Sequence, residues 1–171
     1  ITLRMAIIAV SLAPFVAIPR GYMWQIFGLS VTMGTLHFGL MFVALEHIHV
    51  GTAALIMQTA VPFALLLALI FFRESFGWYQ ATGVLLSFFG VALVVGEPRL
   101  SGGLLYAFLA LISALAFGSA NLQLRGLGGV NVFAINGWMA VFAIPQMAIL
   151  SLIFERGQFA AIQNASFDTW I

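Results

Sequence analysis

The chain has 171 residues, of which 63% are hydrophobic and only 6% are charged. Ordinary soluble domains carry about 25% charged residues, so this chain lacks the polar material to cover a solvated globule. The formal net charge of +1 gives no basic patch for nucleic acid. Because there is no cysteine, a disulfide framework and a cysteine-ligated metal are excluded from this stretch. The composition therefore predicts an integral membrane protein in contact with the lipid bilayer, with no nucleic-acid partner.

The charges mark the ends of the predicted spans, because a charged side chain near the bilayer centre costs about 2.5–3.5 kcal/mol. A helix needs about 20 apolar residues to cross the hydrocarbon core. We therefore expect an all-α, polytopic transmembrane helix bundle with six spans. In chain order they cover residues 1–18, 22–45, 51–72, 78–95, 102–122 and 132–154. The first is short, and Arg4 would have to snorkel along its stem to let it cross.

Short connections such as residues 19–21 should make consecutive helices antiparallel neighbours. Apolar runs such as 63–72 do not alternate with polar residues, which excludes membrane strands. Small residues recur every four positions instead, as at Ala110, Ala114 and Gly118, and this spacing lets helix backbones approach closely in lipid. The pattern therefore predicts tightly packed helices.

Two prolines, Pro62 and Pro145, lie inside predicted helices. Proline has no N–H and its ring clashes with the carbonyl four residues earlier, so each should be a structural kink. The freed carbonyl then needs a neighbouring helix or water. Packing alone is the alternative reason for a proline at either position.

Residues 4–10 align with residues 138–144, which lie five predicted helices later. An odd number of crossings reverses the direction of the chain through the membrane. The match therefore predicts an inverted repeat, an architecture associated with secondary transporters. The three identities pair Met5 with Met139, Ala6 with Ala140 and Ala9 with Ala143.

Four residues are candidates for a substrate cavity, because polar groups inside membrane spans usually face an interior path. They are His37, Gln58, which shares a helix face with Pro62, Asn121 and Trp138. We expect the first three to surround one cavity. Each also has a structural alternative: a hydrogen bond to a neighbouring helix for His37 and Gln58, an interfacial position for Asn121, and the aromatic belt at the membrane surface for Trp138.

Metal and catalytic motifs are absent from the sequence. Glu46, His47 and His49 have metal-ligand side chains but not the helical H-E-x-x-H spacing, so we interpret them as a solvated loop and expect no metal. There is no G-x-S-x-G nucleophile motif and no phosphate-binding loop. We therefore predict no catalytic residue, no cofactor and no enzyme activity.

A run of small residues at 49–55 leads through Pro62 to Phe72, Arg73 and Glu74, and a Gly-Val pair follows at 90–91. This pattern, over residues 3 to about 155, resembles the EamA family of the drug/metabolite transporter superfamily. Arg73 stands where that family usually has glycine.

Two shorter segments, 55–58 and 119–121, are similar to the branch of this family that exports amino-acid metabolites such as O-acetylserine and cysteine. The resemblance implies a ten-helix protein of two inverted five-helix repeats. Residues 1–95 would be helices two to five of the first repeat, and residues 102–171 the start of the second. We accordingly expect a fragment that lacks helices at both ends.

The resemblance also implies a multi-pass protein of the bacterial inner membrane, with Arg20, Arg73 and Arg125 in the cytoplasm. We predict a transporter that exports small polar or amino-acid-like metabolites by alternating access, with a small-molecule substrate as its partner. The alternative is a non-transporting helical membrane subunit that packs against partner helices through its small-residue faces. A homodimer is left open.

Overall fold

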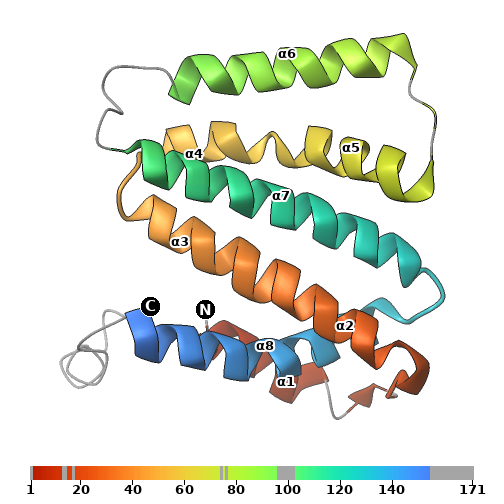
Figure 1. The fold of residues 1–171 in the computed structure, drawn as a ribbon. Helices are drawn as coiled ribbons and strands as arrows, with labels where there is room; N and C mark the ends of the chain where they lie inside the picture. Colours follow the sequence, from red (N-terminus) through yellow and green to blue (C-terminus); the bar gives the residue numbers. More distant parts are fainter. Residues whose placement is uncertain are drawn as a thin grey trace.

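The computed structural model describes residues 2–12, 15–16, 18–73, 75, 77–95 and 103–154, which form a helical bundle without a strand in these ranges (Figure 1). Five segments in this part of the chain are long and apolar enough to cross a membrane. The all-α membrane bundle is thereby confirmed. The five segments are Arg20–Leu45, Val50–Phe72, Trp78–Val95, Leu104–Gly126 and Val132–Leu150.

The sixth expected span, residues 1–18, is not confirmed. Helix α1 covers Thr2–Leu12, and its 11 residues extend about 16 Å, roughly half of the hydrocarbon thickness. Residues 13–14 and 17 lie outside the described ranges.

The second segment contains a wide helical stretch. A 3₁₀ turn, η2 (Arg20–Tyr22), leads into α2 (Met23–Leu29), then into the π-helix η3 (Ser30–Phe38), and finally into α3 (Gly39–Leu45). π-Helical turns are rare and are often found at functional sites. This one carries four polar side chains, namely Ser30, Thr32, Thr35 and His37.

The third segment is interrupted between α4 (Val50–Met57) and α5 (Ala60–Phe72). Pro62 cannot donate a hydrogen bond to the carbonyl of Gln58, and its ring crowds that carbonyl. The backbone N–H groups of Gln58 and Thr59 accordingly bond three residues back instead of four. The break therefore falls four residues before the proline. Helix α8 (Val132–Phe154), in contrast, continues through Pro145 without a break.

Helix α7 (Leu104–Gly126) lies at the centre, where it contacts α3, α4, α5 and the π-helix. Its small residues, Ala110, Ala114 and Gly118, are buried. A Cβ atom on Gly118 would lie 2.9 Å from the carbonyl oxygen of Ala60 and 3.0 Å from the backbone nitrogen of Ala64. The α5 and α7 backbones are therefore in direct contact, as the small-residue spacing predicts.

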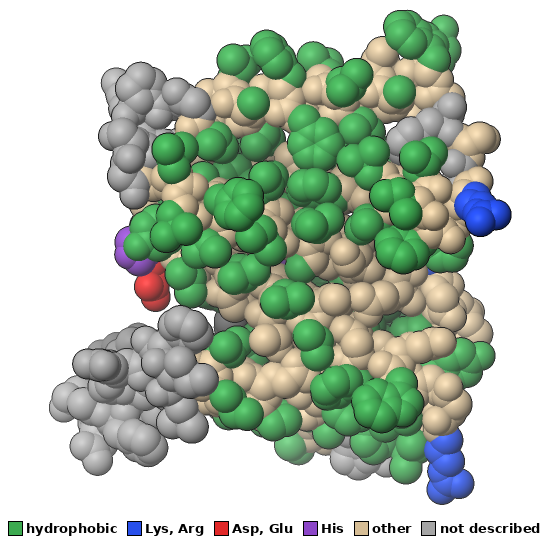
Figure 2. All heavy atoms as spheres, viewed as in Figure 1, with side chains coloured by type: hydrophobic (Ala, Val, Ile, Leu, Met, Phe, Trp, Pro, Cys, Tyr) green, Lys and Arg blue, Asp and Glu red, His purple; other side chains and the backbone are tan. Residues whose placement is uncertain are grey.

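Helix α6 (Trp78–Val95) forms one edge of the bundle and packs on α4 and α5 (Figure 1). It buries little, and bulky side chains such as Leu85 and Phe89 are exposed. Figure 2 shows hydrophobic side chains across the middle of the visible face, with Arg at one edge and Glu and His at the other. This distribution suits a hydrocarbon environment between two polar surfaces.

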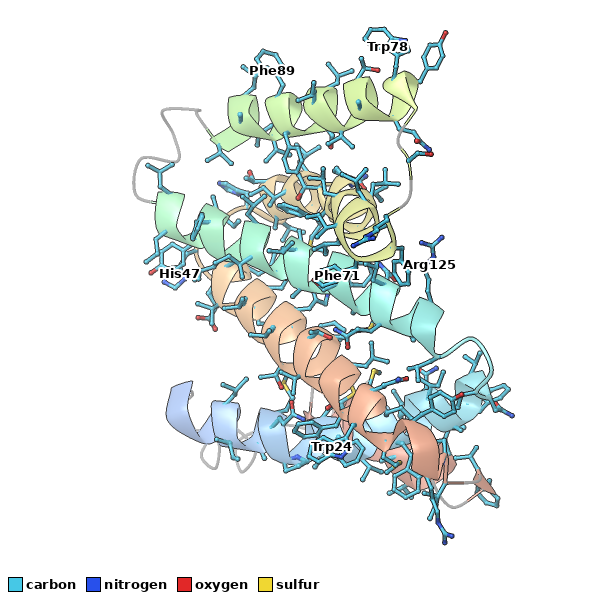
Figure 3. The ribbon with its side chains drawn as sticks, turned by 45° about the vertical axis from the view of Figure 1, so that its right-hand side comes forward. Trp24, His47, Phe71, Trp78, Phe89 and Arg125 are labelled. Atoms are coloured by element: carbon cyan, nitrogen blue, oxygen red, sulfur yellow. The ribbon has the colours of Figure 1, made fainter. Side chains whose placement is uncertain are left out.

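The ends of the bundle differ in charge. Because consecutive segments are antiparallel, Arg20, Arg73 and Arg125 all lie at the same end, which we call the arginine end. Glu46 and His47 lie at the opposite end, and Figure 3 labels His47 and Arg125 at these two ends. The placement of the three arginines together agrees with their predicted position on one side of the membrane.

At the other edge of the bundle, α1 and α8 run antiparallel to each other (Figure 1). Met5 and Ala9 of α1 form one buried cluster with Ala140 and Ala143 of α8. These are residues from the two segments that the internal alignment pairs.

Candidate functional site

His37 is buried on the π-helix and is bound to Ser113 of α7. The serine Oγ donates to the His37 carbonyl oxygen over 2.8 Å, and it lies 2.9 Å from His37 Nδ1. Since the hydroxyl proton is used, the serine oxygen accepts from Nδ1–H. The rings of Phe38 and Phe117 lie on either side, with centroids 4.8 and 4.9 Å from that of the imidazole. His37 therefore fastens the π-helix to α7.

Gln146 of α8 fastens the π-helix on its other side. Its Nε2 donates to Ser30 Oγ over 2.8 Å and to the Phe142 carbonyl over 3.0 Å. Its Oε1 accepts a hydrogen bond from the hydroxyl of Thr35. All three contacts are internal, so this amide is a structural link between two spans.

Gln123 of α7 makes a third link. Its Nε2 donates to Thr32 Oγ1 over 3.2 Å, and the Thr32 hydroxyl in turn lies 3.1 Å from the carbonyl of Gly28. Neither Gln123 nor Gln146 is among the candidates predicted from the sequence, although both carry the signal that selected Gln58, an amide inside an apolar span. The π-helix is thus bound through side chains to α7 and α8.

Gln58 lies at the break between α4 and α5, and its side chain is exposed. It makes no side-chain hydrogen bond within the described ranges. Asn121 is likewise exposed on α7. Trp138 is half-buried against the cluster that contains Ile26 and Leu29, and its Nε1 is buried without a partner among the described residues. The contact of these side chains with a substrate stays a prediction.

A cavity shared by His37, Gln58 and Asn121 stays a prediction. One cavity, of about 490 Å³, lies between residues 15–16 and 19–22 on one side and residues 129–131 and 134 on the other. A second, of about 470 Å³, lies between α2, α5 and α7. Neither is lined by these three residues or by Trp138. His37 faces a neighbouring helix, because the serine opposite it satisfies its polar nitrogen.

In the loop that carries Glu46, His47 and His49, the His47 side chain packs against α7. The His47 ring stacks on Tyr106, with centroids 3.7 Å apart and planes 6° apart, and its Nδ1 lies 3.2 Å from the Val43 carbonyl. Among the described residues there is no group of three or more potential metal ligands. The arrangement ties the end of α3 to the start of α7.

The π-helix and the interrupted third span both lie within a region that matches a known family. The family model for "EamA-like transporter family" matches residues 1–96. The chain belongs to this family. Its members are transporters and not enzymes, which agrees with the absence of a catalytic constellation in the sequence.

The chain is also similar to a "Probable amino-acid metabolite efflux pump" of Escherichia coli (strain K12), with 27% identity over 161 residues. The alignment covers 90% of this chain and 54% of the relative, so the chain spans about half the length of that protein. No solved structure gives a significant match. Family and helices together identify a multi-pass protein of the bacterial inner membrane, as expected.

Proposed function

We propose that the protein exports small polar or amino-acid-like metabolites by alternating access. The observation that carries this proposal is the interruption of the third span at Gln58 and Thr59. Family membership and the name of the Escherichia coli relative support the direction and the class of substrate.

The interruption has the position and the chemistry of a transporter site. Substrate sites of secondary transporters lie near the bilayer midplane and use discontinuous helices. Gln58 is the ninth residue of Val50–Phe72, about 12 Å along a helix that must cross about 30 Å. Its exposed amide offers both a donor and an acceptor. We assign it the contact to substrate, with Asn121 and Trp138 as further candidates.

Alternating access requires two halves that can rock against each other, and the α1–α8 pair supports such an arrangement. The internal alignment makes Ala9 and Ala143 equivalent, and both belong to one buried cluster between antiparallel helices. Equivalent residues meet in this way when two inverted repeats are related by a two-fold axis. We propose residues 1–95 and 102–171 as parts of these repeats.

The test uses the full-length protein in cells and measures efflux of labelled amino-acid metabolites together with protein abundance in the membrane. Gln58→Leu should reduce efflux severalfold at equal abundance, because one good polar contact contributes about 1 kcal/mol. Gln80→Leu is the matched control. That amide is exposed at the start of α6, and among the described residues it bonds only the backbone N–H of Gly77, so efflux should be retained. Unchanged efflux in Gln58→Leu would make Gln58 structural.

The non-transporting subunit stays the second candidate, because the His37 and Gln146 side chains are engaged in hydrogen bonds that join neighbouring helices. Efflux that does not rise above background when the intact protein is abundant would favour this candidate. The homodimer stays a prediction, to be tested by the mass of the purified protein.

A further inference from the structure

The second cavity, which we call the arginine-end cavity, lies between α2, α5 and α7 and has a volume of about 470 Å³. That volume is within the usual range for small-molecule sites. Its lining combines hydrogen-bonding and apolar side chains from three helices. The polar members are Gln25, Ser119 and Gln123, and the main apolar members are Leu67, Phe71 and Phe72.

The cavity begins at the arginine end of the bundle. Gln25 is near the start of α2, Phe72 is the last residue of α5 and Gly126 the last of α7. Figure 3 labels Phe71 and Arg125 at these facing ends of α5 and α7. From Gly126 to Ser119 the helix rises about 10 Å, so the lining extends about a third of the way into the hydrocarbon core.

The side-chain amide oxygen of Gln123, Oε1, is an available hydrogen-bond acceptor in this cavity. Its Nε2 is fixed by the hydrogen bond to Thr32, whereas Oε1 has no hydrogen-bond partner among the described residues. A Cβ atom on Gly28 would lie 3.5 Å from Oε1, so glycine at that position leaves the space in front of the oxygen open. A half-buried acceptor in a membrane span is costly unless something bonds to it.

The other two polar groups complement this acceptor. Ser119 Oγ donates to the Leu115 carbonyl over 2.9 Å, which leaves its lone pairs as acceptors. The Gln25 amide is exposed and can donate. The cavity therefore presents acceptors for an ammonium group and a donor for a carboxylate, beside the apolar surface of Leu67 and Phe71.

We propose that the arginine-end cavity binds a zwitterionic amino acid with an apolar side chain. Gln123 Oε1 and Ser119 Oγ accept from the ammonium group, the Gln25 amide donates to the carboxylate, and Leu67, Phe71 and Phe72 contact the side chain. The inference rests on the proposed function, for which it supplies a loading site at one membrane face, separate from Gln58. A lipid acyl chain fits less well, because it would leave three hydrogen-bonding groups unpaired.

The first test measures protection of a cysteine in the full-length protein in lipid nanodiscs. This chain has no cysteine, so Leu122→Cys, at a lining residue to which the pose assigns no contact, introduces a single thiol once any cysteine elsewhere is replaced by alanine. L-leucine should slow the reaction of this thiol with a methanethiosulfonate reagent at least fivefold, and glycine should slow it less. The matched control, Ser87→Cys on α6, lies outside the cavity and should be unaffected by leucine. No protection by leucine, or equal protection by glycine, would overturn the proposal.

The second test separates ligand contact from packing by measuring the affinity of purified variants for labelled L-leucine. Gln123→Leu and Thr32→Val both abolish the Gln123–Thr32 hydrogen bond, but only Gln123→Leu removes the cavity acceptor. Gln123→Leu should weaken binding at least fivefold and Thr32→Val less than twofold. Equal losses would show that Gln123 is structural and would overturn the assignment.

A third variant covers the case in which Gln123→Leu does not fold. Gly28→Ala makes only an ordinary contact at 3.5 Å but places a methyl group in front of Oε1, so it should weaken leucine binding while the protein stays folded. Unaltered binding would contradict the proposed pose. Because these readouts measure binding, their failure with normal efflux refutes only the cavity, whereas normal protection without efflux refutes only the proposed function.

Discussion

The Ser113 hydroxyl makes two hydrogen bonds of opposite direction with His37, in the buried contact between the π-helix and α7, and His37 Nδ1 also lies 3.3 Å from the Ser113 backbone carbonyl oxygen. Ser113→Ala removes both bonds and leaves the His37 Nδ1–H without the hydroxyl acceptor. A bond between membrane helices contributes about 0.6 kcal/mol on average, and after the substitution Nδ1–H keeps only the Ser113 backbone carbonyl, at 3.3 Å, as an acceptor. We expect the full-length protein to lose about 1–2 kcal/mol, measured as a lower midpoint of thermal unfolding in detergent.

Thr82→Val is the control for that measurement. Within the described ranges, the Thr82 hydroxyl bonds only to carbonyls of its own helix, at Trp78 and Tyr79. Its loss should therefore change the midpoint little. Equal shifts for Ser113→Ala and Thr82→Val would mean that the His37–Ser113 contact adds no interhelical stability.

The link between Thr35 and Gln146 predicts a coupling between two spans. Thr35→Val and Gln146→Leu should each lower the free energy of unfolding, and the double variant should lose less than the sum. Residues in direct contact show coupling energies of about 0.5–3 kcal/mol. The measurement is a double-mutant cycle from unfolding in denaturant. Strict additivity would contradict the contact.

Gly118 predicts a steric effect at the contact between α5 and α7. A Cβ there would meet backbone atoms of Ala60 and Ala64, which cannot rotate away, so Gly118→Ala must separate the helices. Overpacking of this kind typically costs about 1–3 kcal/mol. We expect a lower midpoint of thermal unfolding, and a neutral Gly118→Ala would be inconsistent with the contact.

Gly90→Ala on α6 is the matched control for Gly118→Ala. A methyl group at this position would have no atom of the described residues within 4 Å. The helix preference of alanine should therefore raise stability by up to about 1 kcal/mol. The two variants should shift the thermal midpoint in opposite directions.

Arg73 ends α5 in a left-handed conformation, with φ of 54°. Residues other than glycine reach this region at a cost of about 1–2 kcal/mol, so glycine would relieve the strain at this position. Arg73→Gly should therefore raise the thermal midpoint relative to Arg73→Ala, which removes the same charge but keeps the strain. A higher midpoint for the alanine variant would contradict this account.

The spans could be predicted from the sequence because charges are excluded from hydrocarbon, and this rule needs no knowledge of packing. The first predicted span, residues 1–18, is not confirmed, because the described helix there covers only Thr2–Leu12. The break before Pro62 was predictable as a kink, because the proline ring acts on a defined carbonyl. The π-helix was not, because a hydrogen bond that shifts from four to five residues leaves no pattern in residue types.

It was harder to predict from the sequence which polar residues are exposed and which bond to a neighbouring helix. Gln58, Gln123 and Gln146 are alike in sequence, and only the packing of neighbouring helices decides which amide is exposed and which is enclosed. His37 was identified as a buried polar residue, but its partner Ser113 lies 76 positions away. Such long-range pairs require the arrangement of the helices, which local spacing does not contain.

Transport by the full-length protein in proteoliposomes tests the central claim most directly. Uptake of labelled cysteine or O-acetylserine is measured with and without unlabelled substrate inside, beside vesicles that contain the Gln58→Leu variant. Alternating access predicts uptake above that of protein-free vesicles, acceleration by internal substrate, and a severalfold reduction in Gln58→Leu. Uptake no faster than in protein-free vesicles, with intact protein inserted, would contradict the account.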